Sequence, residues 1–385
     1  DKLRPISLLN FLLKLLEKAI LTSNYETLSR HFDPFQYAYK SKSSTELALI
    51  HFHTAVVNLL DDPRIKHVGI VSCDLSKAFD VIPIDNLIYK LNSFSSIPNG
   101  LVKWIASYLC QRRQRVKISG TLSDCADVTS GVPQGSRLGP VLYSLYTTDL
   151  ISPSGTYVKY ADDVIFITPV SESSDIKRII NYMIDYCSLN YLTLNVNKTK
   201  VMIINRTDPF LELKIKNDLN ITLVSSLTYL GITFNNKFNW FNHISFVISK
   251  CSSKLYILRI LKKSKLCKKD LITIYNSIIR SHIEYSSSVF THLSNNLNNL
   301  INNIQKRAHF IICGVNHCNC NNFTDLKLRR INKSSNIFNN ILIHLNHPLG
   351  HLKPFILPSG RIFISHCYTT NKSDNFIMFN CILYK

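Results

Sequence analysis

The sequence predicts an α+β fold with two or more subdomains, and three observations support this prediction. Residues 67–74 form an apolar run that ends on an acid, as a buried strand does. Residues 156–168 have the pattern of a β-hairpin, whereas the apolar residues from Phe241 to Cys313 recur with a helical period. The chain has 385 residues, more than a single hydrophobic core normally holds, which predicts the division into subdomains.

The remaining elements follow from the same patterns along the chain. Residues 6–21 have the spacing of an amphipathic helix. Its apolar face is formed by Ile6, Leu9, Leu13, Leu16 and Ile20. Further expected elements are a helix from Leu47 to Leu59, mainly helical structure over 84–118 ending in the basic run 112–115, a helix at 175–192, a strand at 199–205 and a hairpin near 221–234.

The chain carries a large excess of positive charge. It has 45 Lys and Arg residues against 25 Asp and Glu residues, a formal net charge of +20. In a chain of globular composition this excess indicates a polyanionic partner, nucleic acid before an anionic membrane. No stretch reaches the roughly 18 uninterrupted apolar residues of a membrane span, so no membrane partner is expected. The chain opens on Asp1 rather than Met, which indicates a piece of a longer product.

The eleven cysteines are scattered, and none of them forms a CxxC pair. The one cluster, His317 with Cys318 and Cys320, lacks the paired spacing of a zinc knuckle or finger. Buried or idle thiols in a reducing compartment are therefore expected, rather than metal ligands or disulfides.

Three aspartates are candidates for a metal site. Asp74 closes the strand at 67–74, and Asp162 and Asp163 occupy the turn of the hairpin. Pairing of these strands would bring the three acids together, as two-metal phosphoryl transfer requires. Carboxylate oxygens suit Mg²⁺, so two Mg²⁺ ions are expected, with Mn²⁺ as an alternative. Because side chains alternate along a strand, Asp162 should point at the metals more directly than Asp163.

A loop rich in Gly and Pro, residues 131–140, precedes the hairpin. Its three glycines allow backbone conformations and close approaches that a Cβ would block. Pro140 suits the first turn of a helix running from Val141 to Leu150. The Gln134 amide can hydrogen-bond nucleotide edges or backbone without adding charge.

In this order, residues 74–80, 130–140 and 160–163 resemble motifs A, B and C of reverse transcriptases, most closely those of jockey-like non-LTR (LINE-type) retrotransposons. The resemblance implies a right-hand polymerase fold with fingers, a palm built on an antiparallel sheet and a helical thumb. It also implies an RNA-directed DNA polymerase that copies retrotransposon RNA into cDNA by two-metal nucleotidyl transfer. The implied partners are an RNA template, a DNA primer, the RNA–DNA duplex and dNTPs, and the oligomeric state stays open.

The resemblance also assigns roles to single residues. Phe79 matches the aromatic position that packs under the sugar and collides with a 2′-hydroxyl, thereby selecting deoxynucleotides. Residues 194–200 resemble motif D, which makes Lys198 a candidate catalytic proton donor to the leaving pyrophosphate. The implied nucleotide-binding residues are Lys40, Leu75, Phe79, Gln134, Gly135 and Tyr160. The implied primer grip is Tyr229, Leu230 and Gly231.

Two fingers motifs extend the resemblance toward the start of the chain. Residues 3–7 with Glu17 and Lys18 look like the first, and residues 36–45 look like the second. In the second motif Ala38 stands where a Gly is usual, and Lys40 stands where an Arg is usual. Lysine keeps a point charge for a triphosphate but loses the bidentate fork of arginine.

The resemblance implies a domain order along the chain. Residues 1–70 belong to the fingers, 71–240 to the palm with inserted fingers helices at 84–118, and 241–313 to the thumb. The tail at 314–385 has no predicted fold. The thumb region is rich in basic residues, and those expected to bind nucleic acid are Lys254, Lys262 and Lys265. An intracellular ribonucleoprotein, found in nucleus and cytoplasm, is the expected setting.

Two alternatives remain beside this interpretation. A group II intron maturase shares the Tyr-Ala-Asp-Asp sequence, but it typically carries a Gly where this chain has Ser136. A catalytically decayed or domesticated nucleic-acid-binding relic is favoured by Ala38 and by the fragmentary start. The intact carboxylates and Gln134 argue against that relic.

Overall fold

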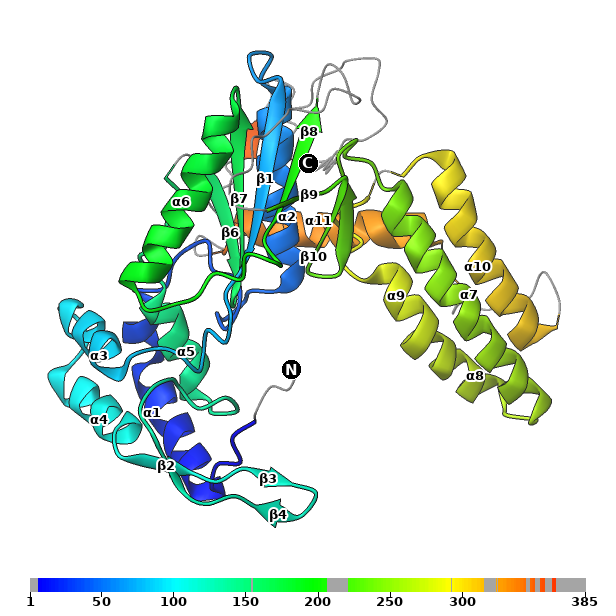
Figure 1. Ribbon diagram of the computed structural model, residues 1–385. Coiled ribbons are helices and arrows are strands. Elements are labelled where there is room, and N and C mark those ends of the chain that lie inside the picture. Colours follow the sequence, from blue (N-terminus) through cyan, green and yellow to red (C-terminus); the bar gives the residue numbers. More distant parts are fainter. Residues whose placement is uncertain are drawn as a thin grey trace. The chain divides into compact units, whose positions relative to one another are not determined.

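The computed structural model describes residues 6–153, 155–205, 221–291, 293–314, 323, 325–343, 347–349, 354–356 and 362–364 (Figure 1). The predictions made for residues 3–5 and for the cysteine cluster at 317–320 lie outside these residues, as does most of the predicted tail. By its internal contacts the chain forms two compact units. Unit 1 contains the described residues of 1–44, 69–201 and 214–223, and unit 2 contains those of 45–68, 202–213 and 224–385.

Helices and strands occur in both units, which confirms the predicted α+β class. The helices of unit 1 are α1 (Phe11–Ser29), α3 (Ile84–Ser93), α4 (Asn99–Leu109), α5 (Leu138–Tyr146) and α6 (Ser173–Leu189). The strands that begin or end in unit 1 are β1 (His67–Asp74), β2 (Arg112–Gln114), β3 (Lys117–Ile118), β4 (Thr121–Leu122), β5 (Ala126–Val128), β6 (Thr156–Tyr160), β7 (Asp163–Val170), β8 (Lys200–Asn205) and β9 (Thr222–Leu223).

Unit 2 is mainly helical. Its helices are α2 (Thr45–Asp61), α7 (Phe241–Lys263), α8 (Lys268–Tyr275), a π-helical turn (Asn276–Arg280), α9 (Ser281–Glu284), α10 (Asn295–Cys313) and α11 (Leu326–Ile343). Its hairpins are formed by β10 (Ser226–Tyr229) with β11 (Ile232–Asn235) and by β12 (Pro354–Ile356) with β13 (Ile362–Ile364). No described helix is long and apolar enough to cross a membrane.

A five-stranded sheet with the order β6-β7-β1-β8-β9 is the framework of unit 1. β6 and β7 form an antiparallel hairpin in which Tyr160 pairs with Asp163. Gly69 near the start of β1 lies against Val170 at the end of β7, so these neighbouring strands also run in opposite directions. α6 packs on β7 (Figure 1), and a Cβ at Gly69 would come within 2.4 Å of the Cδ1 of Ile176. A larger residue at this position would therefore displace the side chains of Ile176 and Val170 between helix and sheet.

Residues 35–37 extend this sheet along β6. The Tyr37 amide donates to the Lys159 carbonyl (2.9 Å), and the Lys159 amide donates to the Phe35 carbonyl (2.9 Å). Backbone bonds of this kind fix the register of the added segment against the strand. We call residues 33–37 the brace segment, because it runs beside the strand that leads into the hairpin turn.

A buried ion pair holds the brace segment in place. Asp33 and Lys159 form a salt bridge in which each side chain is 1% exposed. The Lys159 ammonium also donates to the carbonyls of Thr147 and Leu150, at 2.9 Å each. Burial lowers the pKa of Lys159, although the negative charge of Asp33 opposes that shift. The cation is therefore fully hydrogen-bonded and neutralised inside the unit.

Aromatic side chains form much of the core of unit 2. Residues 47–56 of α2 are all buried, as expected of a helix covered on every side. Phe52 packs edge-on against Phe234 of β11, with ring centroids 4.8 Å apart. His53 stacks on Trp240 at 5.6 Å, and burial lowers the pKa of His53 to about 3, so the imidazole is neutral.

The first predicted helix is wrong at its start, and only part of its predicted apolar face is covered, with Leu9, Leu13 and Ile20 half-buried. α1 begins at Phe11 rather than Ile6, and Leu16 on the predicted apolar face is 46% exposed. The helix buries Glu17, which accepts hydrogen bonds from the Tyr108 hydroxyl (2.6 Å) and the Arg137 amide (2.7 Å). Glu17 is therefore stable at a buried position of the helix, because both donors satisfy its carboxylate.

Other elements agree with the sequence, with shifted boundaries. The strands at 67–74 and 199–205, the hairpin at 156–168 and the helical region from Phe241 to Cys313 are confirmed. The basic run at 112–115 does not end a helix. It contains β2, which pairs with β5. The helix expected from Val141 to Leu150 begins at Leu138 and ends at Tyr146. Near residue 222, β9 pairs in parallel with β8, and the hairpin follows at residues 226–235.

We predict that Asp33→Asn lowers the free energy of unfolding by about 3–5 kcal/mol, because Lys159 then stays buried without its counter-charge. Chemical denaturation followed by tryptophan fluorescence would measure this loss. Glu26→Gln is the matched control, since Glu26 pairs with Arg30 at side-chain exposures of 86% and 65% and should contribute less than about 1 kcal/mol. Equal losses of unfolding free energy in the two variants would show that the buried pair does not stabilise the attachment of the brace segment to β6.

Candidate functional site

The carboxylates predicted from the sequence meet at one edge of the unit 1 sheet. β1 ends at Asp74 and its neighbour β7 begins at Asp163, and the two strands are antiparallel. Both residues therefore lie at the same edge, with Asp162 in the turn just before β7. Asp74 and Asp162 are half-buried and Asp163 is exposed.

Residues Ala161 and Asp162 form the two-residue turn between β6 and β7. Ala161 has a φ of 56°, in the left-handed region that side chains other than glycine seldom adopt. Gln36 of the brace segment holds it there. Its Oε1 accepts from the Ala161 amide (3.0 Å) and its Nε2 donates to the Ala161 carbonyl (3.2 Å). We call this paired contact the Gln36 clamp.

The clamp is itself fixed in position. Gln36 is 2% exposed, and its Oε1 also accepts from the Ala38 amide (3.0 Å). Because the side chain is buried, water cannot replace the two bonds to Ala161. The clamp therefore determines the backbone conformation that presents Asp162.

The candidate metal ligands are the carboxylates of Asp74, Asp162 and Asp163. Among the described residues, no three His, Cys, Asp or Glu side chains lie close enough together to hold a metal ion. Asp74, Asp162 and Asp163 nevertheless supply hard oxygen donors at one sheet edge, which is the donor type that Mg²⁺ and Mn²⁺ bind. The donor set therefore fits a divalent cation by the type of its oxygens.

Lys198 lies beside the first of these carboxylates. Its Nζ is 3.1 Å from Oδ2 of Asp74, and the lysine side chain is 62% exposed. The backbone supports this approach, because the Asn195 amide donates to the Asp74 carbonyl (2.9 Å). The residue predicted as a proton donor thus reaches the carboxylate edge.

The loop at 131–140 interlocks with the chain after Asp74. The Gly131 amide donates to the Ile82 carbonyl (2.8 Å). A Cβ on Gly131, whose φ is 80°, would lie 2.5 Å from the Asp80 carbonyl oxygen. Gln134 donates from Nε2 to Oδ1 of Asp80 (2.8 Å), and its carbonyl accepts from the Ser7 amide (2.8 Å). Gln134 is thus held at the site by Asp80.

Phe79 lies between two tyrosines. Its ring stacks on Tyr143 with centroids 4.6 Å apart and meets Tyr39 edge-on at 6.2 Å. Burial raises the pKa of Tyr143 well above its usual value, and the nearby charge of Asp162 adds to this shift. The aromatic stack is therefore close to the carboxylate edge.

The other predicted nucleotide-binding residues differ in accessibility. Leu75 is 2% exposed, so only its backbone could meet a ligand. Burial lowers the pKa of Lys40, against a smaller opposing effect of Asp33. Tyr160 is half-buried and Gly135 is exposed. Gly135 has a φ of 106°, and a Cβ there would lie 3.1 Å from the Ser7 carbonyl oxygen.

The predicted primer grip and basic helical residues belong to unit 2. Leu230 and Gly231 form the turn of the β10–β11 hairpin with φ values of 45° and 83°, and the Tyr285 hydroxyl donates to the Leu230 carbonyl (2.8 Å). The preceding Tyr229 is 3% exposed.

Two of the three predicted nucleic-acid-binding lysines make contacts within unit 2. Lys254 bonds to His282, and Lys262 donates to the Ile312 carbonyl (2.9 Å), whereas Lys265 is exposed.

The sequence interpretation missed four residues that shape the site. The sequence predicts Gln36 only as part of the fingers motif at residues 36–45, and it predicts no role for Asp33, Lys159 and Tyr143. The isolated Lys159 between apolar neighbours of β6 was a usable signal, because a lysine there requires a buried acid. No sequence signal pairs Gln36 with a turn 125 residues later.

The sequence of the chain matches a known protein family. The family described as reverse transcriptase (RNA-dependent DNA polymerase) matches residues 1–234. This match covers more than half of the chain, and the chain therefore belongs to the reverse transcriptase family. Its members use divalent metal ions. Family membership confirms the recognition made from the motifs.

Similar proteins come from retrotransposons of Drosophila melanogaster. The probable RNA-directed DNA polymerase from transposon BS is 27% identical over 290 residues, covering 69% of this chain and 31% of that protein. The RNA-directed DNA polymerase from mobile element jockey is 26% identical over 311 residues, covering 75% of this chain and 33% of that protein. The chain thus spans about a third of the length of these relatives.

Among solved structures, apo telomerase from Candida Tropicalis aligns with a TM-score of 0.44 and 12% identity. The alignment covers 88% of this chain and 59% of that chain.

We predict that Gln36→Leu accelerates amide hydrogen exchange at Ala161 about tenfold, because the turn loses a buried clamp that contributes roughly 1.4 kcal/mol. Exchange of peptides covering the hairpin turn, read by mass spectrometry, would measure it. Ile70→Val, at a fully buried position of β1, is a control for general loss of stability. If both variants accelerate exchange at the turn equally, the clamp has no local role.

Proposed function

We propose that this chain acts as an RNA-directed DNA polymerase that extends a DNA primer on an RNA template with dNTPs. The observation that carries the proposal is the grouping, within unit 1, of three elements. These are the carboxylate edge, the Gln134 loop and the ring of Phe79, and they were predicted from separate stretches of sequence. Family membership supports the reaction class.

In this proposal Asp74, Asp162 and Asp163 hold two Mg²⁺ ions, which Mn²⁺ could replace. Bound divalent ions would neutralise charge on the attacking and leaving oxygens. The residues of the chain position those ions and the substrates. Because Lys198 pairs with Asp74 when no ion is present, ion binding there would release the ammonium toward the departing pyrophosphate.

Nucleotide selection rests on the aromatic stack. Tyr143 stacks on the ring of Phe79 and Tyr39 meets it edge-on, so the two tyrosines would hold the ring in position beside an incoming ribose. A 2′-hydroxyl would collide with this ring, and a deoxyribose would not. Gln134 and the exposed backbone of Gly135 would contact the incoming nucleotide or template, and Lys40 would attract the triphosphate as a point charge.

The rest of the proposal concerns the nucleic acid and its setting. Tyr229, Leu230 and Gly231 would support the primer end. Lys254, Lys262 and Lys265 would bind phosphates of the RNA–DNA duplex, with Lys254 and Lys262 exchanging their present partners for phosphate. An intracellular ribonucleoprotein, in nucleus and cytoplasm, is the proposed setting. The simplest test is primer extension by the chain on a poly(rA) template with an oligo(dT) primer.

We predict that Asp162→Asn lowers the extension rate by about 10³-fold or more, because the metal ions stabilise the transition state by several kcal/mol. Binding of the primer–template, measured by fluorescence anisotropy, should stay nearly unchanged. Asp124→Asn, an exposed acid of the same unit, is the matched control and should extend normally. Extension by Asp162→Asn at the rate of the parent chain would rule out the proposed metal site.

We predict that Phe79→Val raises the use of rNTPs relative to dNTPs by on the order of tenfold, because the smaller side chain admits a 2′-hydroxyl. Single-nucleotide incorporation with competing dNTP and rNTP would give this ratio. Phe94→Val removes a half-buried ring of the same unit, which stacks on His31, and should leave the ratio unchanged. An unchanged ratio in Phe79→Val would make Phe79 a core residue.

A further inference from the structure

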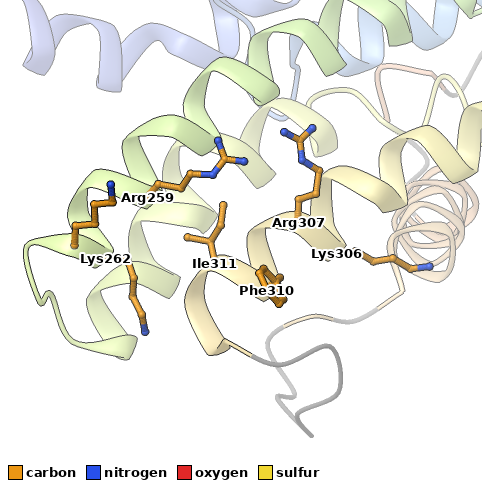
Figure 2. A pocket seen from close by; sticks show the side chains of 7 residues that line it. Arg259, Lys262, Lys306, Arg307, Phe310 and Ile311 are labelled. Atoms are coloured by element: carbon orange, nitrogen blue, oxygen red, sulfur yellow. The ribbon is translucent and has the colours of Figure 1, made fainter.

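Helices α7 and α10 of unit 2 pack together and leave an open groove between their carboxyl-terminal halves (Figure 2). The groove has a volume of about 670 Å³. Five cationic side chains line it, namely Arg259, Lys262, Lys263, Lys306 and Arg307. Phe310 and Ile311 complete the lining. We call this feature the α7–α10 groove.

The groove concentrates positive charge that the two helices do not neutralise. Neither α7 nor α10 contains an Asp or Glu. Within the described part of the chain, no ion pair is formed by the five cations. Figure 2 shows Arg259 and Arg307 extending from opposite helices toward the same side, with Ile311 between them. Like charges held this close favour a bound polyanion.

One lysine of the groove has a structural role. Lys262 donates to the Ile312 carbonyl (2.9 Å), which joins the end of α7 to the last turn of α10. A cation at a helix carboxyl terminus also balances the helix dipole. That contact explains Lys262, but it does not explain Arg259, Lys306 and Arg307, which lie further back along the two helices.

Phe310 indicates which polyanion the groove accepts. Its ring is 53% exposed although it lies among cationic side chains. An exposed ring in a basic groove is a stacking platform for a nucleic acid base, and guanidinium groups stack on bases as well. The bases of a duplex are already stacked on one another, so only a single strand could use the ring.

We propose that the α7–α10 groove binds a single-stranded nucleic acid segment, with phosphates on Arg259, Lys306 and Arg307 and a base on Phe310. This site goes beyond the proposed polymerase reaction. It also differs from the duplex contacts assigned to Lys254, Lys262 and Lys265, because stacking on Phe310 requires an unpaired base.

The test measures binding of a fluorescent oligouridylate of about a dozen nucleotides to the full chain over a series of salt concentrations. Phe310→Leu should weaken binding roughly 5- to 100-fold and leave the salt dependence unchanged, since stacking releases no counterions. The double variant Arg259→Gln and Arg307→Gln should weaken binding and lower the log–log salt slope by about 1.4, which is two single-strand phosphate contacts.

Matched controls lie elsewhere in unit 2. Phe246→Leu removes a ring that is 48% exposed on α7 outside the groove. Lys269→Gln with Lys327→Gln removes the same charge from exposed positions outside the groove. These variants should bind the oligouridylate like the parent chain. Circular dichroism would verify that all variants are folded.

Three outcomes would overturn the proposal. The first is unchanged oligouridylate binding by both groove variants. The second is an equal loss of oligouridylate and blunt RNA–DNA duplex binding in Phe310→Leu, which would make the groove part of a duplex grip. The third is binding to vesicles containing phosphatidylserine that depends on the groove while oligouridylate binding does not. Loss of extension in Asp162→Asn bears on the polymerase site alone, so the two proposals can fail separately.

Discussion

The carboxylate edge depends on one constraint, which is the attachment of the brace segment to strand β6. The buried pair of Asp33 with Lys159 fixes the segment beside the strand, and the Gln36 clamp then holds Ala161 in a left-handed conformation. Without this support a non-glycine residue at that turn position would relax, because the conformation is strained by roughly 1–2 kcal/mol. The position of Asp162 is therefore set by residues 125 positions earlier in the chain.

The elements that depend on local pattern were predictable from the sequence. The apolar run ending at Asp74, the hairpin that carries Asp162 and Asp163 and the helices after Phe241 all occur where periodicity places them. Contacts between distant polar residues were not predictable. The burial of Glu17 beside the half-buried Leu13 and Ile20 was not predictable from apolar spacing, because a carboxylate is stable inside only when donors such as Tyr108 and Arg137 meet it.

The acids of the carboxylate edge and the cations of the α7–α10 groove belong to different units of the molecule. The three acids of the site lie at a sheet edge in unit 1, where Lys198 partly neutralises Asp74. The cations of the α7–α10 groove lie in unit 2 on helices that lack acids. The carboxylate edge attracts a divalent ion and, unless metal is present, repels nucleic acid phosphate. The α7–α10 groove attracts nucleic acid phosphate. Metal binding and nucleic acid binding should therefore support each other.

In the proposed function, the carboxylates of β1 and of the β6–β7 turn bind divalent metal together. Iron-directed cleavage in the presence of hydrogen peroxide and ascorbate is a direct test, because Fe²⁺ bound in place of Mg²⁺ reduces the peroxide to a hydroxyl radical that cuts the backbone beside the ion, and ascorbate returns Fe³⁺ to Fe²⁺. We expect cuts near both Asp74 and Asp162, which Mg²⁺ should suppress by competition and which should disappear together in Asp74→Asn. Cuts at only one of these positions, or cuts that persist in Asp74→Asn, would contradict a shared site.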